Sequence, residues 1–115
     1  MSDSMGRSLG GSQALETFLA EAPALAKAWM GAVESLAAAN ALDDKTRHLA
    51  YLAVLAALRL ESGVPFHVQL AKNAGASREE VMSAILIGLP AAGNAVIQSL
   101  QAALAAYDAP AGATR

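Results

Sequence analysis

The stretch LDDKTRHLAYLAVLAALRLESGVPFHVQLAKNAGAS, residues 42–77, decides the fold. Its first half predicts a long helix that begins after Asp43, because an aspartate there can cap free N–H groups and favours the positive helix end. All ten residues from Leu49 to Leu58 are apolar, and a helix that is apolar on every side is expected to be buried on every side. A bilayer span needs about 20 residues. The stretch therefore predicts the central helix of a soluble bundle.

The second half of this stretch predicts a break and a shorter helix. Residues 61–63 interrupt the pattern, and a helix from Val64 is closed by Gly75 as a C-cap glycine would close it. The two histidines of the protein, His48 and His67, both lie in this stretch. We therefore expect the chemistry of the chain to lie here.

Before this stretch, the sequence predicts a flexible segment over residues 1–11 and a short helix capped by Ser12. A second helix follows over residues 23–40, with Pro23 in its first turn. Its apolar side chains recur at helical spacing and include Trp29, which we interpret as a core or interface anchor; ligand stacking is the alternative for Trp29.

After the stretch, Ser77 and Glu80 form a capping box that opens another helix. Pro90 and Gly93 interrupt it, and a last helix is expected from there to about Tyr107. The prediction is one domain over residues 12–108, an all-α bundle of about six helices, followed by a tail over residues 109–115.

Composition limits the function classes. Of the 115 residues, 55% are hydrophobic and only 4% aromatic, which favours packed helices rich in alanine and leucine. So much apolar surface on a small domain predicts a homo-oligomer. The net charge of −2 includes no basic patch, so we expect no nucleic-acid binding. The chain has no cysteine, which excludes thiol chemistry and disulfides within it. No apolar signal segment opens the chain, so we expect a cytoplasmic location without membrane association.

His67 is the first candidate for catalysis. It lies near the start of its helix, where the helix dipole lowers the pKa and favours neutral imidazole, which can act as a general base. His48 is expected about 10 Å away along the helix axes, because a short turn makes the two helices antiparallel. Tyr51, one turn after His48, could share the pocket. The alternative is that His67 is a packed histidine bonded to backbone and His48 a partly exposed polar residue.

Arg47 and Arg59 could bind a substrate carboxylate, or could be ordinary solvated charges. The two histidines do not have the spacing of a metal motif, so we expect no metal. Gly88 and Gly93 span a broken helix, which is not the context of a nucleotide-binding loop; no cofactor is expected.

The region from Leu42 to about Tyr107, and more loosely the chain from Ala22 onward, resembles the carboxymuconolactone decarboxylase family, which includes alkylhydroperoxidase D-like proteins. The resemblance is carried by LDDKTR, the Ala/Leu-rich helix, Phe66-His67 and AGASREE. It implies the alkylhydroperoxidase D-like helical bundle, and trimers or hexamers of the chain.

The redox branch of that family uses a glutamate, a Cys-x-x-Cys pair and a histidine. On this chain those positions are His48, Leu60, Gly63 and His67, so only the histidine is retained. Thiol peroxidase activity needs both thiols and is disfavoured.

The decarboxylase branch lacks the cysteine pair and works by acid–base chemistry on a lactone that carries a carboxylate. The resemblance implies a lyase-like role with His67 and His48 in catalysis, and Tyr51, Arg47 and Arg59 at the substrate. Three hypotheses remain open: such an enzyme acting by decarboxylation or isomerisation on a small carboxylated or lactone compound, a non-catalytic small-molecule-binding protein, and an oligomeric scaffold.

Overall fold

The computed structural model describes residues 13–110, which form helices and contain no strand. In chain order the elements are α2 (Gln13–Glu21), α3 (Pro23–Ala39), α4 (Asp44–Ala57), the 3₁₀ helix η1 (Glu61–Gly63), α5 (Val64–Asn73), α6 (Arg78–Leu86), α7 (Leu89–Ala92), the 3₁₀ helix η2 (Gly93–Ser99) and α8 (Leu100–Asp108). This confirms the all-α fold, with a number of helices close to the prediction. The predicted flexible segment 1–11, the Ser12 cap and residues 111–115 lie outside the described residues.

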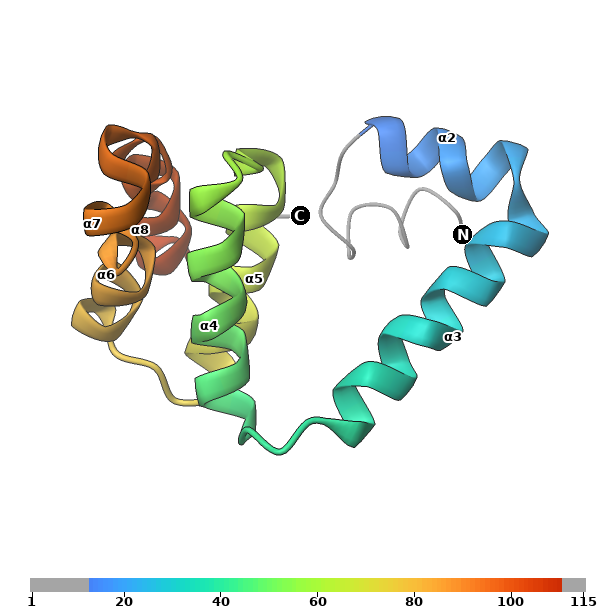
Figure 1. The fold of residues 1–115 in the computed structure, drawn as a ribbon, viewed down its shortest axis with the longest axis horizontal. Coiled ribbons are helices and arrows are strands. Elements are labelled where there is room, and N and C mark those ends of the chain that lie inside the picture. Colours follow the sequence, from blue (N-terminus) through green and yellow to red (C-terminus); the bar gives the residue numbers. More distant parts are fainter. Residues whose placement is uncertain (1–12, 111–115) are drawn as a thin grey trace.

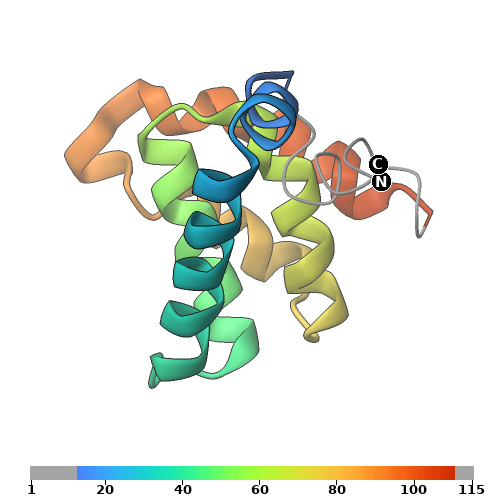
Figure 2. The same cartoon turned by 90° about the vertical axis from the view of Figure 1, so that its right-hand side faces the viewer.

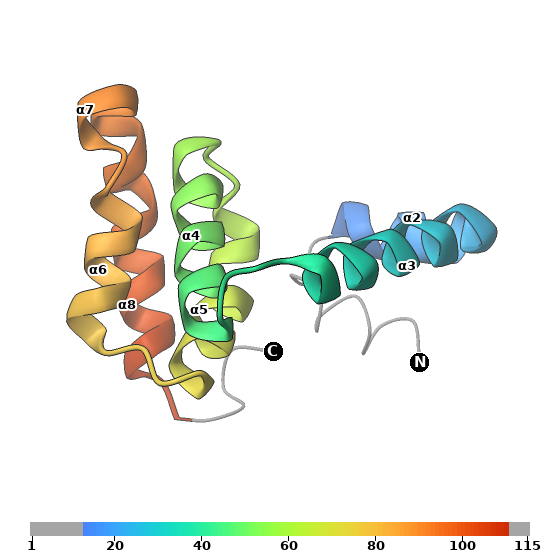
Figure 3. The ribbon, with the colours of Figure 1, turned by 60° about the horizontal axis from the view of Figure 1, so that its bottom comes forward.

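Helices α4, α5, α6 and α8 form a compact bundle, with α7 and η2 at one end (Figure 1). Their inner faces share one core, whose fully buried side chains include Leu52, Val64, Val68, Val81 and Ile85. Helices α2 and α3 make up an arm that leaves this bundle. Figures 1 and 3 both show α3 diverging from α4 beyond the connecting turn, and α3 packs mainly against α2.

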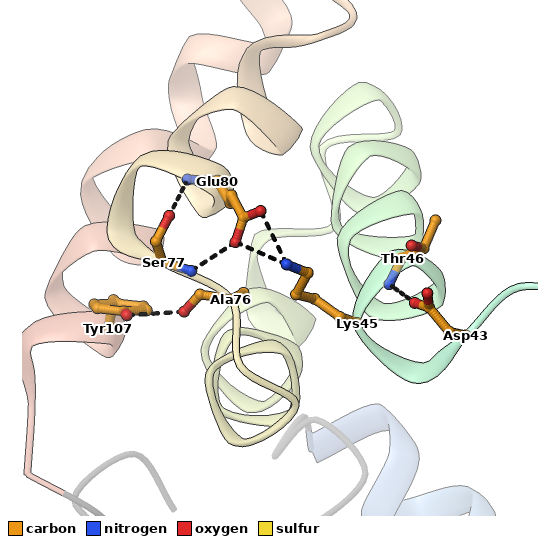
Figure 4. Close-up of polar contacts among 7 residues, drawn as sticks. All are labelled: Asp43, Lys45, Thr46, Ala76, Ser77, Glu80 and Tyr107. Atoms are coloured by element: carbon orange, nitrogen blue, oxygen red, sulfur yellow. Dashed lines mark hydrogen bonds and ion pairs between the residues drawn. The ribbon is translucent and has the colours of Figure 1, made fainter.

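Three predicted helix ends are confirmed. The Asp43 carboxylate accepts a hydrogen bond of 2.8 Å from the Thr46 N–H and so caps α4. Gly75 follows α5 with a φ of +100°, the left-handed conformation that glycine adopts without strain. Ser77 and Glu80 form the reciprocal capping box of α6 (Figure 4).

Polar contacts from the same region connect the helices of the bundle. Lys45 of α4 forms an ion pair with Glu80 of α6 at 3.1 Å, and the Tyr107 hydroxyl of α8 donates to the Ala76 carbonyl at 2.8 Å (Figure 4). Lys72 of α5 donates to the Tyr107 carbonyl at 2.6 Å. These contacts fix α5 and its histidine relative to the rest of the bundle.

Two expectations need correction. Helix α4 is not buried on every side within one chain, because Tyr51, Val54 and Leu58 are 47%, 50% and 62% exposed. The arm that could cover this face points away from it. Trp29, an expected core or interface anchor, is 55% exposed on α3 and is therefore not a core residue of the single chain.

The expected last helix is also different. Its first half is η2, a 3₁₀ helix that starts at Gly93 with a φ of +63°, and only its second half is the α-helix α8. The run from Arg78 to Asp108 is long and apolar enough by composition for a membrane span. It is divided among α6, α7, η2 and α8, and its side chains Val81, Ile85 and Val96 belong to the core.

Candidate functional site

His67 is the centre of the candidate site. It is the fourth residue of α5, and its ring lies 4.5 Å from the ring of Tyr51 on α4, centroid to centroid. The ring of Phe66 meets His67 edge-on at 5.2 Å. The antiparallel turn brings the middle of α4 against the start of α5, which places Tyr51 beside His67.

The imidazole of His67 has an unused polar atom. Its Nδ1 is buried and has no hydrogen-bond partner among the described residues, whereas buried polar atoms are normally paired. The alternative interpretation was a packed histidine bonded to backbone; Nδ1 makes no such bond to any residue that the structure describes. This nitrogen therefore has an unused hydrogen-bonding capacity, and because its own surface is buried, a partner reaches it only when the surrounding side chains move.

Burial controls the charge of His67. Burial, and to a smaller extent the positive charge that His48 can carry, lowers the pKa of His67 to about 4. The expected direction is correct, but burial rather than the helix start is the main cause. At neutral pH the imidazole is therefore uncharged, and it can accept or donate a hydrogen bond without a desolvated charge.

His48 lies on α4 one turn before Tyr51 and is half-buried. Its own pKa is lowered by burial and by the neighbouring Arg47, against an opposing effect of Asp44. The two histidines are close enough for charge on one to oppose charge on the other. They can therefore belong to one site, in which a charge on His48 opposes the protonation of His67.

The two predicted carboxylate anchors lie at opposite ends of α4. Arg47 forms an ion pair with Asp44 at 3.2 Å, one turn earlier on the same helix. Arg59 follows the end of α4, is exposed, and has no ion-pair partner in the part of the chain that the structure describes. Twelve residues separate them, or about 18 Å along a helix. One substrate carboxylate beside His67 would therefore contact one of them, and Arg59 is the unpaired one.

Away from His67, the described residues contain two hollows and no cluster of metal ligands. Within residues 13–110, no three His, Asp or Glu side chains come together as metal ligands. A hollow of about 460 Å³ lies between α4 and α6, lined by Leu49, Ala53 and Ala84 among others. A second, of about 440 Å³, lies in the elbow of α2 and α3 beside Trp29. Neither is lined by a predicted site residue.

Two neighbours of His67 were not among the predicted site residues. Phe66 precedes it in the chain, yet the two rings meet because both project from the first turn of α5. A Cβ built at Gly63 would lie 3.9 Å from Cδ2 of His67 and 3.6 Å from the Leu55 side chain. Gly63 could have been predicted as a neighbour of His67, because it lies four residues, or about one helical turn, before it.

The comparisons with known proteins concern family only. The sequence model of the carboxymuconolactone decarboxylase family matches residues 23–107, which is most of the chain. No curated protein and no solved structure matches the sequence.

Proposed function

Because the chain belongs to the carboxymuconolactone decarboxylase family, we propose that it binds a small carboxylated or lactone compound at His67 and transfers a proton to or from it. The reaction is of the decarboxylation or isomerisation type. The observation that carries the proposal is the buried, unpartnered Nδ1 of His67 beside the Tyr51 ring. A site with an unused imidazole and no thiol is suited to acid–base chemistry and unsuited to peroxide reduction.

A carboxylated substrate suits the low pKa of His67. An imidazole with a pKa of about 4 is a weak base and is not protonated at pH 7. A carboxylate bound beside it would raise that pKa, because an opposite charge favours the charged form. In a decarboxylation, the electron pair of the broken C–C bond stays on the substrate carbon, CO₂ leaves, and that carbon takes up a proton. His67, made more basic by the bound carboxylate, is the group that would carry this proton.

The other residues have supporting roles in the proposal. His48 would influence the protonation of His67, as its effect on that pKa indicates. Tyr51 would pack against the substrate side of the imidazole. Arg59 would hold the carboxylate in preference to Arg47, whose charge is already paired with Asp44.

The second candidate is a binding protein without catalysis. Tyr51 and Phe66 flank His67 on α4 and α5, which restricts the movement that a proton carrier needs. In either case we propose that the chain forms a homo-oligomer, in support of which seven large apolar side chains of α3 and α4 are exposed.

The test is a thermal-shift screen of small carboxylic acids, lactones and quinones on the wild type and on His67→Gln. We expect a compound that raises the Tm of the wild type and leaves that of His67→Gln unchanged, followed by turnover of that compound class measured by NMR. Arg59→Gln should weaken the shift more than Arg47→Gln does. Gln101→Ala, an exposed change on α8, is the control and should behave as wild type. An equal shift in His67→Gln would contradict a site at His67, and binding without turnover would favour the second candidate.

A further inference from the structure

One face of α3 is apolar and uncovered. Leu25, Trp29, Val33 and Leu36 recur at helical spacing along this 17-residue helix, and they are 68%, 55%, 41% and 68% exposed. Figure 2, seen from the side of the arm, shows α3 in front of α4 and α5, away from the core. We refer to these four residues as the α3 stripe. The α3 charges, Lys27 and Glu34, do not fall within the helical spacing of the stripe.

The outer face of α4 is apolar and uncovered as well. Tyr51, Val54 and Leu58 stand at positions i, i+3 and i+7, which places them on one side of the helix. No charged residue lies between Leu49 and Leu58. The two helices, of 17 and 14 residues, are about 25 and 21 Å long. The α3 stripe runs over about 17 Å of its helix and the outer face of α4 over about 11 Å, so the two surfaces match in chemistry and the stripe is long enough to cover the outer face.

The chain does not bring its own two surfaces together. The Asn40 side chain accepts a hydrogen bond of 2.8 Å from the Leu42 N–H, and Asp43 caps α4 directly afterwards. This short, bonded connection leads α3 away from α4 (Figures 1 and 3). A partner must supply the cover, and a second copy of this chain carries the complementary surface.

We propose that α3 of a second copy lies along the outer face of α4, and that Trp29 of that copy covers Tyr51 and closes the open side of the His67 site. In a reciprocal pair each copy buries both surfaces. Seven side chains, each between 41% and 68% exposed, supply several hundred Å² per copy, close to the ~800 Å² that each partner buries in a standard interface. The closure of the site rests on the function proposed above; the helix contact does not.

Cross-linking tests the helix contact, and the absence of native cysteine makes it unambiguous. The variants Val33→Cys and Val54→Cys are purified separately, one of them with a mass tag, then mixed and oxidised. We expect a covalent heterodimer between position 33 of one copy and position 54 of the other. The matched control is Glu34→Cys, which is exposed on α3 beside Val33 but outside the stripe, mixed with Val54→Cys; it should cross-link much less.

Three results would overturn the helix contact. One is an oligomer that gives no mixed disulfide. Another is a monomer at micromolar concentration. The third is an intramolecular disulfide in the dilute Val33→Cys/Val54→Cys double variant, which would show that the arm covers its own α4.

Chemical modification tests the closure of the site without a ligand. Diethyl pyrocarbonate modifies unprotonated imidazole. His67, with a pKa of about 4, is unprotonated at pH 7, so its modification rate depends on how easily the reagent reaches the ring. Trp29→Ala should raise the modification rate of His67 several-fold, with Lys27→Ala on the same helix as the control. An unchanged rate in a protein that still forms the 33–54 cross-link would overturn the closure. Failure of the proposed function would instead appear as absent ligand binding with both of these results intact.

Discussion

At the scale of the residue, His67 joins an unsatisfied polar atom to an apolar environment. Its Nδ1 has no partner among the described residues, and the rings of Tyr51 and Phe66 lie against it. Protonation places a charge in these surroundings, and the lowered pKa measures that cost. The residue that carries this unpaired nitrogen therefore also makes the folded state sensitive to acid.

We expect His67 to make stability fall as the pH is lowered from about 6.5 to about 4. The pKa of His67 is about 4 in the folded protein, below its ordinary value of 6.5. Between these two pH values the unfolded chain binds a proton that the folded chain does not, so the free energy of unfolding decreases as the pH decreases. The loss is on the order of 2 kcal/mol after allowance for solvent screening. Urea unfolding at several pH values measures it.

His67→Gln is the comparison for this prediction, because it removes the titration and keeps a polar side chain. Its stability should depend less on pH between 4 and 6.5 than that of the wild type. The carboxylates whose pKa values are lowered in the fold, such as Glu80 and Asp108, lose their contribution at lower pH in both proteins. Equal pH dependence of the two proteins would contradict the burial of His67.

The site could be predicted in part from the sequence. Position along two antiparallel helices was enough to bring Tyr51 to His67, because local spacing and a short turn determine it. Asp44 and Arg47 are three residues apart, so their ion pair could be predicted from the sequence. That pairing would have made Arg59 the preferred candidate for binding a substrate carboxylate. The orphaned Nδ1 of His67 could not be foreseen, since it depends on which side chains surround the ring in three dimensions.

At the scale of the element, α4 and α5 end in the same way with different residues. Each is followed by a left-handed residue, Arg59 with a φ of 60° and Gly75 with a φ of 100°. The residue after it donates its N–H to a carbonyl in the last turn of the helix: Leu60 to Leu55 after α4, and Ala76 to Ala71 after α5. This is the hydrogen bond of the Schellman motif. Arginine at this position is strained and glycine is not.

We expect Arg59→Gly to stabilise the protein by about 1 kcal/mol, because it removes the left-handed strain at the end of α4. Gly75→Ala should destabilise it by a similar amount, since it introduces the same strain after α5. A Cβ at Gly75 would meet no atom within 4 Å, so a clash does not complicate the result. Urea unfolding of both variants at pH 7 is the measurement. A loss of stability in Arg59→Gly would contradict the strain.

Helix ends that depend on local sequence were predictable, and those that depend on packing were not. The Ser77–Glu80 capping box and the Asp43 cap involve residues within one turn, so the sequence contains the whole motif. The 3₁₀ helix η2 is different. It packs against α4 and α7, and nothing in the sequence of Gly93–Ser99 distinguishes it from the start of an α-helix.

At the scale of the whole molecule, the composition and the structure both indicate more apolar surface than a single chain buries. The sequence predicted a buried central helix, yet α4 exposes Tyr51, Val54 and Leu58, and α3 exposes its stripe. That expectation was wrong for a single chain because it treated burial as a property of the chain alone. The surface that remains is the basis for the homo-oligomer proposed above.

We therefore expect thermal stability to depend on protein concentration. If oligomerisation covers these faces, the folded assembly gains on the unfolded chains by mass action, and a hundred-fold rise in concentration should raise the Tm by roughly 5 °C for a domain of this size. Val54→Asp should abolish this dependence and lower the Tm, because it places a charge at the centre of the outer face of α4. Gln101→Glu adds the same charge at an exposed position of α8 and should retain the dependence. Scanning calorimetry of the three proteins over this concentration range makes the measurement, and a wild-type Tm that does not move with concentration would mean that the two apolar faces stay uncovered.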